Sequence, residues 1–129
     1  MTTLRIGRII LFAKDLGRLL AFYRDVVGMA VVPGSDDSEG FVSLDGGACS
    51  LSLHRIPEPY ASQIEIRDPP VAREDTPIKF AFFCEDVATT RAELIGRGAA
   101  MGEVRTFGPV VLCDGVDPEG NVFQLSNRI

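Results

Sequence analysis

The chain has 129 residues, 46% hydrophobic and 24% charged, which is the composition of a folded domain rather than a disordered segment. Its net charge of −5 argues against nucleic-acid binding, which usually needs a basic face. No apolar run approaches the roughly 20 residues of a membrane-spanning helix, and the short N-terminal apolar run lacks a cleavage site, so we expect a cytoplasmic protein.

The first predicted elements are a strand and a helix. Residues 8–13 (RIILFA) form a short apolar run that ends before Asp15, a natural N-cap. Gly28 then suits the left-handed position after a helix C-terminus. Between them, apolar residues recur at spacings of three and four, as in an amphipathic helix. This stripe consists of Leu16, Leu19, Leu20, Tyr23 and Val27.

A short strand is expected near residues 29–33, followed by a hairpin over residues 41–53 with an Asp-Gly-Gly turn. Residues 56–77 contain five prolines, which resist helix and central strand. We therefore expect a linker at about 57–76, between module one at about 4–56 and module two at about 77–129.

The second module repeats the first. KFAFFCEDV (79–87) matches RIILFAKDL (8–16) at an offset of 71. A helix capped by Asp86 is expected next, with a weaker apolar stripe that ends at Gly98. A short strand near 101–107 and a second hairpin over 110–125 complete the copy. The helix stripe consists of Val87, Leu94 and Ile95.

The closing hairpins align as well. Asp45 matches Asp117 at an offset of 72, so Ser52 falls on Gln124. Each module is thus predicted to contain one strand, one helix and about three further strands. Such a unit covers one face of its sheet with its helix and leaves the other face open.

This repeated plan and two motifs resemble the vicinal oxygen chelate superfamily, also called the glyoxalase/bleomycin-resistance/dioxygenase superfamily. IILFAKDLGRLLAFYRDVVGM is similar to its opening strand and helix, and DPEGNVFQL is similar to its closing strand. The resemblance covers nearly the whole chain apart from the linker. It implies an α+β fold in which two βαβββ modules form a curled mixed sheet around a cleft, within a single domain (residues 1–129).

In metal-dependent members of that superfamily, each module gives one ligand from its opening strand and one from its last strand. The matching residues here are Arg8, Ser52, Lys79 and Gln124. Arginine and lysine offer no lone pair, serine is a weak neutral oxygen, and only Gln124 offers an amide oxygen. We therefore expect no cofactor and no divalent metal.

Strand alternation predicts which side chains line the cleft. They share the open faces of the sheets, except for Tyr60, a linker aromatic that can close over the pocket. The predicted ligand-binding residues are Arg8, Ile10, Phe12, Ser50, Ser52, His54, Tyr60, Lys79, Phe83 and Gln124. Apolar walls with a few polar groups are the usual composition of a small-molecule site.

Two interpretations of Arg8 and Lys79 stay open. Either they lie at the sheet rim, solvated or paired with carboxylates such as Glu103 or Asp114, or they present positive charge to an anionic ligand. Burying both without a partner would be costly, so an acidic group or an anion is expected beside them.

Three functions follow from these observations. The leading prediction is a metal-independent protein that binds a small anionic or aromatic molecule in the cleft between its modules. The alternative is a glyoxalase-like lyase or isomerase, or a dioxygenase-related enzyme with an atypical site, with His54, Lys79 and Gln124 as candidate catalytic residues. The third is a partner-binding module whose pocket is filled by side chains. The superfamily commonly dimerises, so we also expect a homodimer, with neither nucleic acid nor membrane as a partner.

Overall fold

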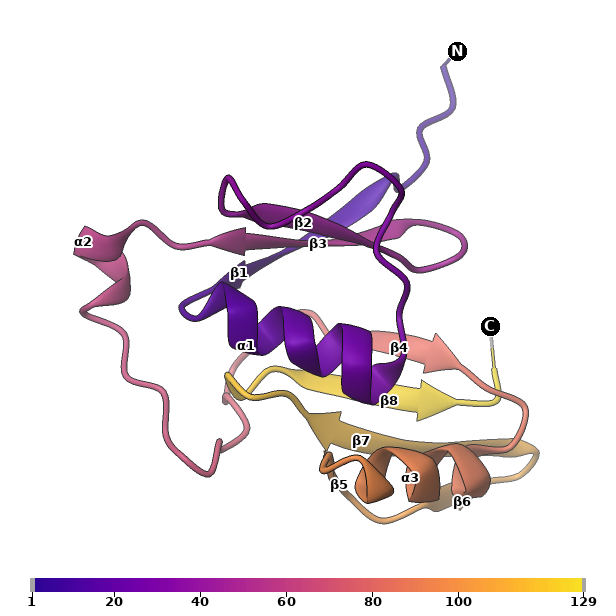
Figure 1. Ribbon diagram of the computed structural model, residues 1–129. Coiled ribbons are helices and arrows are strands. Elements are labelled where there is room, and N and C mark those ends of the chain that lie inside the picture. The colour runs from indigo at the N-terminus through magenta and orange to yellow at the C-terminus, as the bar shows by residue number, and fades with distance from the viewer. Residues whose placement is uncertain (1, 129) are drawn as a thin grey trace. The chain divides into compact units, whose positions relative to one another are not determined.

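The computed structural model describes residues 2–128, and the chain divides into two compact units, Met1–Glu65 and Ile66–Ile129 (Figure 1). Each unit contains one open sheet with parallel and antiparallel pairs and one main helical segment. The predicted α+β fold class is confirmed.

The sheet of the first unit has the strand order β1-β3-β2. Strand β1 (Arg8–Ala13) pairs in parallel with β3 (Ser50–Arg55), and β3 pairs antiparallel with β2 (Phe41–Asp45). The predicted opening strand and hairpin are therefore confirmed.

The strand expected near residues 29–33 is wrong in extent, because only one bridge forms there, between Val31 and Leu44. Pro33 lacks an N–H donor for a continued ladder. Gly34 then takes a φ of +84° and turns the chain away from the sheet.

The helix of the first unit has two parts, α1 (Leu16–Ala21) and a π-helical continuation, η1 (Phe22–Val27). The Asp15 side chain accepts a hydrogen bond from the Arg18 backbone N–H at 3.1 Å, and Gly28 ends the segment with a φ of +94°. Both predicted caps are thus confirmed. Figure 1 shows α1 running along one side of the sheet, where it packs against β3. The buried residues of this segment are Leu16, Leu19, Leu20, Phe22 and Tyr23.

The sheet of the second unit has the order β4-β8-β7-β5, and β6 also pairs with β7. Strand β4 is parallel to β8, whereas β5, β6 and β8 are antiparallel to β7. The expected hairpin and the expected strand near 101–107, here two short strands, are both present. The bounds are β4 (Phe80–Phe83), β5 (Ala100–Met101), β6 (Arg105–Phe107), β7 (Val110–Val116) and β8 (Val122–Ser126).

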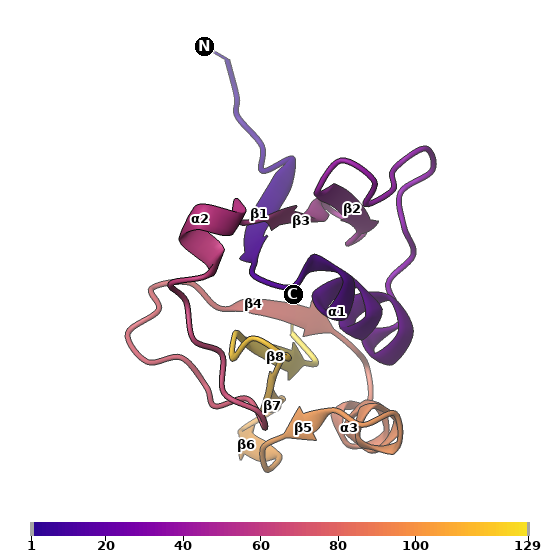
Figure 2. The same cartoon turned by 60° about the vertical axis from the view of Figure 1, so that its left-hand side comes forward.

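Helix α3 (Val87–Gly96) covers one face of this second sheet, as Figure 2 shows nearly end-on. Asp86 caps it by accepting from the Thr89 N–H at 3.0 Å. Val87 and Leu94 are buried as predicted, but Ile95 is 43% exposed, so its place in the stripe is wrong. One residue is a rotation of about 100° in an α-helix, and Leu94 already takes the inward direction.

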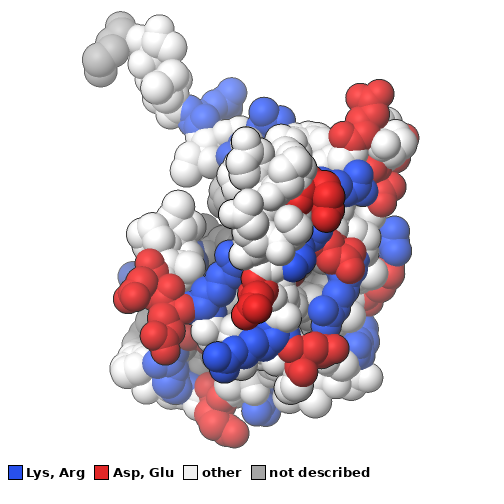
Figure 3. Space-filling view, turned by 90° about the vertical axis from the view of Figure 1, so that its left-hand side faces the viewer, with Lys and Arg blue, Asp and Glu red and all other residues white. Residues whose placement is uncertain are grey.

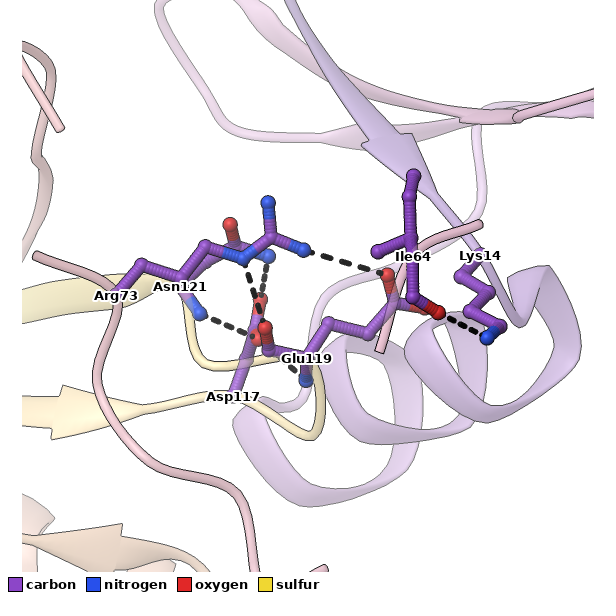
Figure 4. Close-up of polar contacts among 6 residues, drawn as sticks. All are labelled: Lys14, Ile64, Arg73, Asp117, Glu119 and Asn121. Atoms are coloured by element: carbon purple, nitrogen blue, oxygen red, sulfur yellow. Dashed lines mark hydrogen bonds and ion pairs between the residues drawn. The ribbon is translucent and has the colours of Figure 1, made fainter. Parts of the chain in front are cut away.

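Residues 57–76 contain a short helix that the proline content did not predict, α2 (Glu58–Ala61). Pro57 and Pro59 lie at its start, where the backbone N–H groups have no partner within the helix, so proline is tolerated. Its flanks are tied to the end of β1: the Ile56 N–H donates to the Ala13 carbonyl at 2.8 Å, and Lys14 donates to the Ile64 carbonyl (Figure 4).

The two hairpin turns differ in length by one residue. Asp45 pairs with Ser50 across residues 46–49, whereas Val116 pairs with Val122 across residues 117–121. Val116 therefore holds the place of Asp45, and the expected equivalence of Asp45 and Asp117 is wrong. The equivalence of β3 and β8 holds, since Ser52 pairs with Ile10 and Gln124 pairs with Ala81.

Candidate functional site

The open face of the first sheet carries most of the predicted ligand-binding residues. Alternation along the three paired strands places one set of side chains on the side away from α1. Ile10 and Phe12 on this side are 42% and 58% exposed, while Ala13, on the other side, is buried. We call this set the aromatic face: Arg8, Ile10, Phe12, Phe41, Ser43, Asp45, Ser50, Ser52 and His54.

Rings and one cation form the chemical centre of the aromatic face. The His54 ring lies 5.7 Å from that of Phe12 and 5.6 Å from that of Phe41, between centroids. The Arg8 guanidinium carbon lies 5.3 Å from the centroid of Phe41, within range of a cation–π interaction. A guanidinium held over a ring keeps its N–H donors available at the edge, where a carboxylate can be bound.

Two hydroxyl groups lie at the middle of the same face. The Ser43 and Ser52 oxygens are 2.8 Å apart, and Ser52 is fully buried. Ser52 therefore has its hydrogen-bonding partner within the sheet. Ser50 is half-buried and His54 is exposed at the strand end.

The open face of the second sheet carries charges instead of rings at its centre. Register places Gln124 beside Ala81 on one side and Asp114 on the other. Lys79 Nζ lies 3.3 Å from Asp114 Oδ1, Arg105 Nη2 lies 3.4 Å from Asp114 Oδ2, and Gln124 Nε2 donates to Asp114 Oδ1 at 3.1 Å. We call this set the ionic face: Lys79, Ala81, Phe83, Arg105, Asp114 and Gln124.

Lys79 pairs with Asp114, one of the two carboxylates considered as its partner, and whether it also binds an anionic ligand stays a prediction. Glu103, the other carboxylate considered, lies 3.8 Å from Arg91 instead. Arg8 has a ring, Phe41, as its neighbour. Tyr60 is exposed on α2 in the first unit.

Sequence reasoning missed Phe41 and Arg105. Phe41 shares the alternation of Ser43, so extending the hairpin face by one step would have included it. Arg105 lies on β6, a three-residue strand whose partner is fixed by the register of β7, with Arg105 opposite Leu112. A strand this short gives no periodic signal in the sequence.

The turn of residues 117–120 fixes the start of β8, and hence Gln124. Asp117 is fully buried, and its carboxylate accepts from the backbone N–H groups of Glu119 and Asn121 and from the Asn121 side chain, at 2.9 to 3.0 Å (Figure 4). Arg73 covers this turn: its backbone N–H donates to Gly120, and its Nε donates to the Glu119 carbonyl. The proline-rich segment is thus fastened to the second hairpin.

Metal-ligating side chains do not cluster in residues 2–128: no three His, Cys, Asp or Glu side chains lie where they could hold one ion. In the same range, no helix combines the length and apolar content that crossing a membrane requires. On the face shown in Figure 3, basic and acidic side chains are interspersed.

A family model described as a glyoxalase-like domain matches residues 8–126. No curated protein matches the sequence.

Several solved structures share the fold. UcmS2 superimposes with a TM-score of 0.77 at 17% identity, covering 98% of this chain and 100% of that chain. TnmS3, an antibiotic-binding protein from Streptomyces sp. CB03234, gives 0.68 at 19% identity, covering 97% and 96%. Lactoylglutathione lyase from Agrobacterium tumefaciens gives 0.66 at 23% identity, covering 97% and 94%.

Proposed function

The chain belongs to the glyoxalase-like family of the vicinal oxygen chelate superfamily, and on that basis we propose that it binds a small anionic or aromatic molecule without a metal. Each unit offers one surface for such a ligand, the aromatic face of the first sheet and the ionic face of the second, and each surface carries cations together with at least one ring. The antibiotic-binding neighbour TnmS3 supports sequestration of a small molecule as one use of this fold.

The observation that carries the proposal is the state of the four positions at which metal-using relatives hold their ion. Arg8 lies over Phe41, and Lys79 pairs with Asp114. Ser52 is buried against a second hydroxyl, and Gln124 directs its amide nitrogen at a carboxylate. Two cations and an amide that donates do not fit a divalent cation, which needs lone pairs and negative charge.

A cation beside aromatic rings fits a planar anion instead. The ring of such a ligand packs on Phe12 or His54, and its carboxylate meets the Arg8 guanidinium through paired N–H donors. Because Phe41 holds the guanidinium in place, less side-chain entropy is lost on binding.

Metal content and ligand binding test the two halves of the proposal separately. Protein dialysed against Zn²⁺, Ni²⁺ or Mn²⁺ and then desalted is expected to retain far less than one ion per chain by elemental analysis. Stoichiometric retention would overturn metal independence and leave binding to be judged by the second test.

For that second test, a thermal-shift screen of aromatic carboxylates against their neutral amides is expected to favour the carboxylates. Arg8→Ala is expected to remove the shift given by carboxylates that bind the aromatic face, whereas Arg5→Ala, which also removes one exposed positive charge, is expected to keep it. If Arg8→Ala leaves the shift of every carboxylate unchanged, the aromatic face is not a ligand site.

The enzyme alternative has its own readout. His54 is exposed and lies between two rings, an arrangement that suits recognition of a ring more than the transfer of a proton. Turnover of methylglyoxal with glutathione, lost in His54→Gln, would replace the binding proposal with glyoxalase-like chemistry. We also propose a homodimer, which sedimentation would test.

A further inference from the structure

We propose that Asp114, with Lys79 and Arg105, forms a subsite that selects a singly charged carboxylate over a doubly charged one. This inference rests on the proposed function, is confined to the ionic face of the second sheet, and adds Asp114 and Arg105 to the residues proposed to bind a ligand there. It assigns to Asp114 the role of a fixed counter-ion that sets how much negative charge a ligand can bring.

The geometry gives Asp114 three neighbours. Lys79 approaches both carboxylate oxygens at 3.3 and 3.4 Å, Arg105 approaches Oδ2 at 3.4 Å, and the Gln124 amide donates to Oδ1 at 3.1 Å. The two cationic contacts are longer than the 2.7 to 2.9 Å typical of charge-assisted hydrogen bonds. An ammonium has three donors and a guanidinium has five, so both cations keep N–H groups for a second anion.

The charge of the cluster follows by addition. Two cations and one carboxylate leave a net charge of +1. Glu103 lies beside Arg91 and therefore does not neutralise the remaining charge. The side chains are open to solvent, with exposed fractions of 41% for Lys79, 52% for Arg105 and 32% for Asp114. A ligand carboxylate of charge −1 completes the neutralisation, whereas a dianion meets repulsion from Asp114.

An apolar flank specifies the rest of the ligand. Phe83 is 53% exposed and lies one pleat beyond Ala81 on the same face, beside Ser126. Asp114 lies two strands across the sheet from β4, in the row of Ala81, so about 9–10 Å across the strands adds to the step of about 6–7 Å along β4. A ring packed beside Phe83 can therefore bring its carboxylate toward the cations, whose long side chains extend over this face, if a short extended spacer separates the ring from the carboxylate. An aryl-substituted acrylate has this form.

Three ligands that share one carbon skeleton and differ in charge measure which ligand charge the subsite prefers. Cinnamate carries one carboxylate, benzylidenemalonate carries two at the same end of the same skeleton, and cinnamamide is neutral. Their dissociation constants are measured at pH 7.5 and low salt by titration of backbone amide NMR signals of β4, β7 and β8. The natural protein is expected to bind cinnamate more tightly than either of the others.

Asp114→Asn removes the counter-ion and keeps the side-chain shape, so the cluster charge rises to +2. The ratio of benzylidenemalonate to cinnamate affinity is expected to rise about tenfold, which lies between the bulk-water and surface limits for one unit charge at contact. Arg105→Gln is expected to weaken cinnamate in the natural background, which keeps the test decisive if Asp114→Asn does not fold. Glu103→Gln, which removes a carboxylate from the neighbouring ion pair, is expected to leave the ratio unchanged.

These measurements distinguish a failure of the proposed subsite from a failure of the proposed function. If cinnamate binds but Asp114→Asn leaves the ratio unchanged, or Arg105→Gln leaves its affinity unchanged, the subsite is overturned while the proposed function stands. If neither this panel nor the wider screen of aromatic anions gives a shift with the natural protein, the proposed function fails and the subsite with it.

Discussion

The aromatic face and the ionic face occupy matching positions on two sheets of the same plan, yet their chemistry differs. Arg8 corresponds to Lys79, Ser52 to Gln124, and the registers make Ser43 the counterpart of Asp114. In the first unit the opening cation meets a ring, and in the second it meets Asp114. The difference teaches that two positions on the neighbouring hairpin decide how the cation of the opening strand is held: they carry Phe41 and Ser43 in the first unit, and Leu112 and Asp114 in the second.

The turns of the two hairpins differ as much as the faces. In the first unit Gly47 is exposed, and its N–H donates to the Asp45 side chain at 2.8 Å. In the second unit Gly120 is buried beneath the segment that contains Val71 and Arg73. Both glycines have a φ of +85°, so the backbone requirement is the same and only the surroundings differ.

These two glycines give the largest expected effect. Gly120→Ala places a Cβ 2.4 Å from the Val71 carbonyl oxygen, so the overlying segment must shift, and the free energy of unfolding is expected to fall by about 3 kcal/mol or more. Gly47→Ala meets nothing within 4 Å and is expected to cost about 1–2 kcal/mol, the price of the left-handed backbone alone. Urea denaturation measures both. Equal losses would show that segment 71–73 does not cover the turn.

Substitutions at the centres of the two faces give the next largest losses of stability. The uncharged pair, Ser43 and Ser52, is expected to contribute more than the charged cluster around Asp114. Ser43→Ala leaves the fully buried Ser52 hydroxyl without its partner and is expected to cost about 1–3 kcal/mol. Asp114→Asn disrupts ion pairs that water screens, and is expected to cost less than about 1 kcal/mol.

The same denaturation curves check this order. A double variant, Ser43→Ala with Ser52→Ala, is expected to lose less than the sum of the single losses, because no lone hydroxyl remains. The comparison between the faces would be broken if Asp114→Asn proved the more destabilising of the two single changes.

Much of this comparison could be predicted from the sequence. Local sequence signals predicted the helix caps at Asp15 and Asp86 and the alternation of the opening strands. The structure confirms these predictions. The register of the hairpins depends on turn length, and the extra residue in the second turn misaligned Asp45 with Asp117. Asp114 was considered only as a partner for a cation. Its position beside Gln124 becomes clear once five residues, 117–121, are assigned to the turn.

Elements without periodicity were harder to predict. Residues 57–76 looked unable to form a helix, yet prolines at the first positions of α2 cost nothing there. The π-helical turns of η1 share their apolar stripe with an ordinary helix, so sequence spacing does not separate the two. Arg105 belongs to a strand that exists only through its pairing with β7.

The two units are alike in their helix N-caps, since an aspartate caps the helix in each. The pH dependence of stability tests what such a cap contributes. Hydrogen bonds from Thr89, first from its backbone N–H, lower the pKa of Asp86. A lowered folded-state pKa gives stability that is present above the unfolded value of about 3.9 and is lost as pH falls through the folded value.

Asp86→Ala is therefore expected to lower the melting temperature at neutral pH, and its deficit is expected to shrink as pH falls below about 4. Asp86→Asn, which can still cap, serves as the control and is expected to lose less at neutral pH. Asp15→Ala should reproduce the neutral-pH loss, because Asp15 makes the same contact to the third residue after it. A deficit for Asp86→Ala that grows in acid would contradict the assignment.

The smallest effect separates the two ways in which the opening cations are held. Double-mutant cycles on Arg8 and Phe41, and on Lys79 and Asp114, are each expected to give couplings of about 0.5–1 kcal/mol or less at low salt. In 1 M NaCl the Debye length falls to about 3 Å, so the Lys79–Asp114 coupling is expected to vanish. The Arg8–Phe41 coupling is expected to persist in part, because a guanidinium stacked on a ring also gains dispersion and apolar contact.

Urea denaturation of the single and double alanine or leucine variants at both salt concentrations gives these couplings. If 1 M NaCl removed both coupling energies equally, Arg8 would be held on the aromatic face by electrostatic attraction alone. The two faces would then differ only in which residue is the partner of the cation.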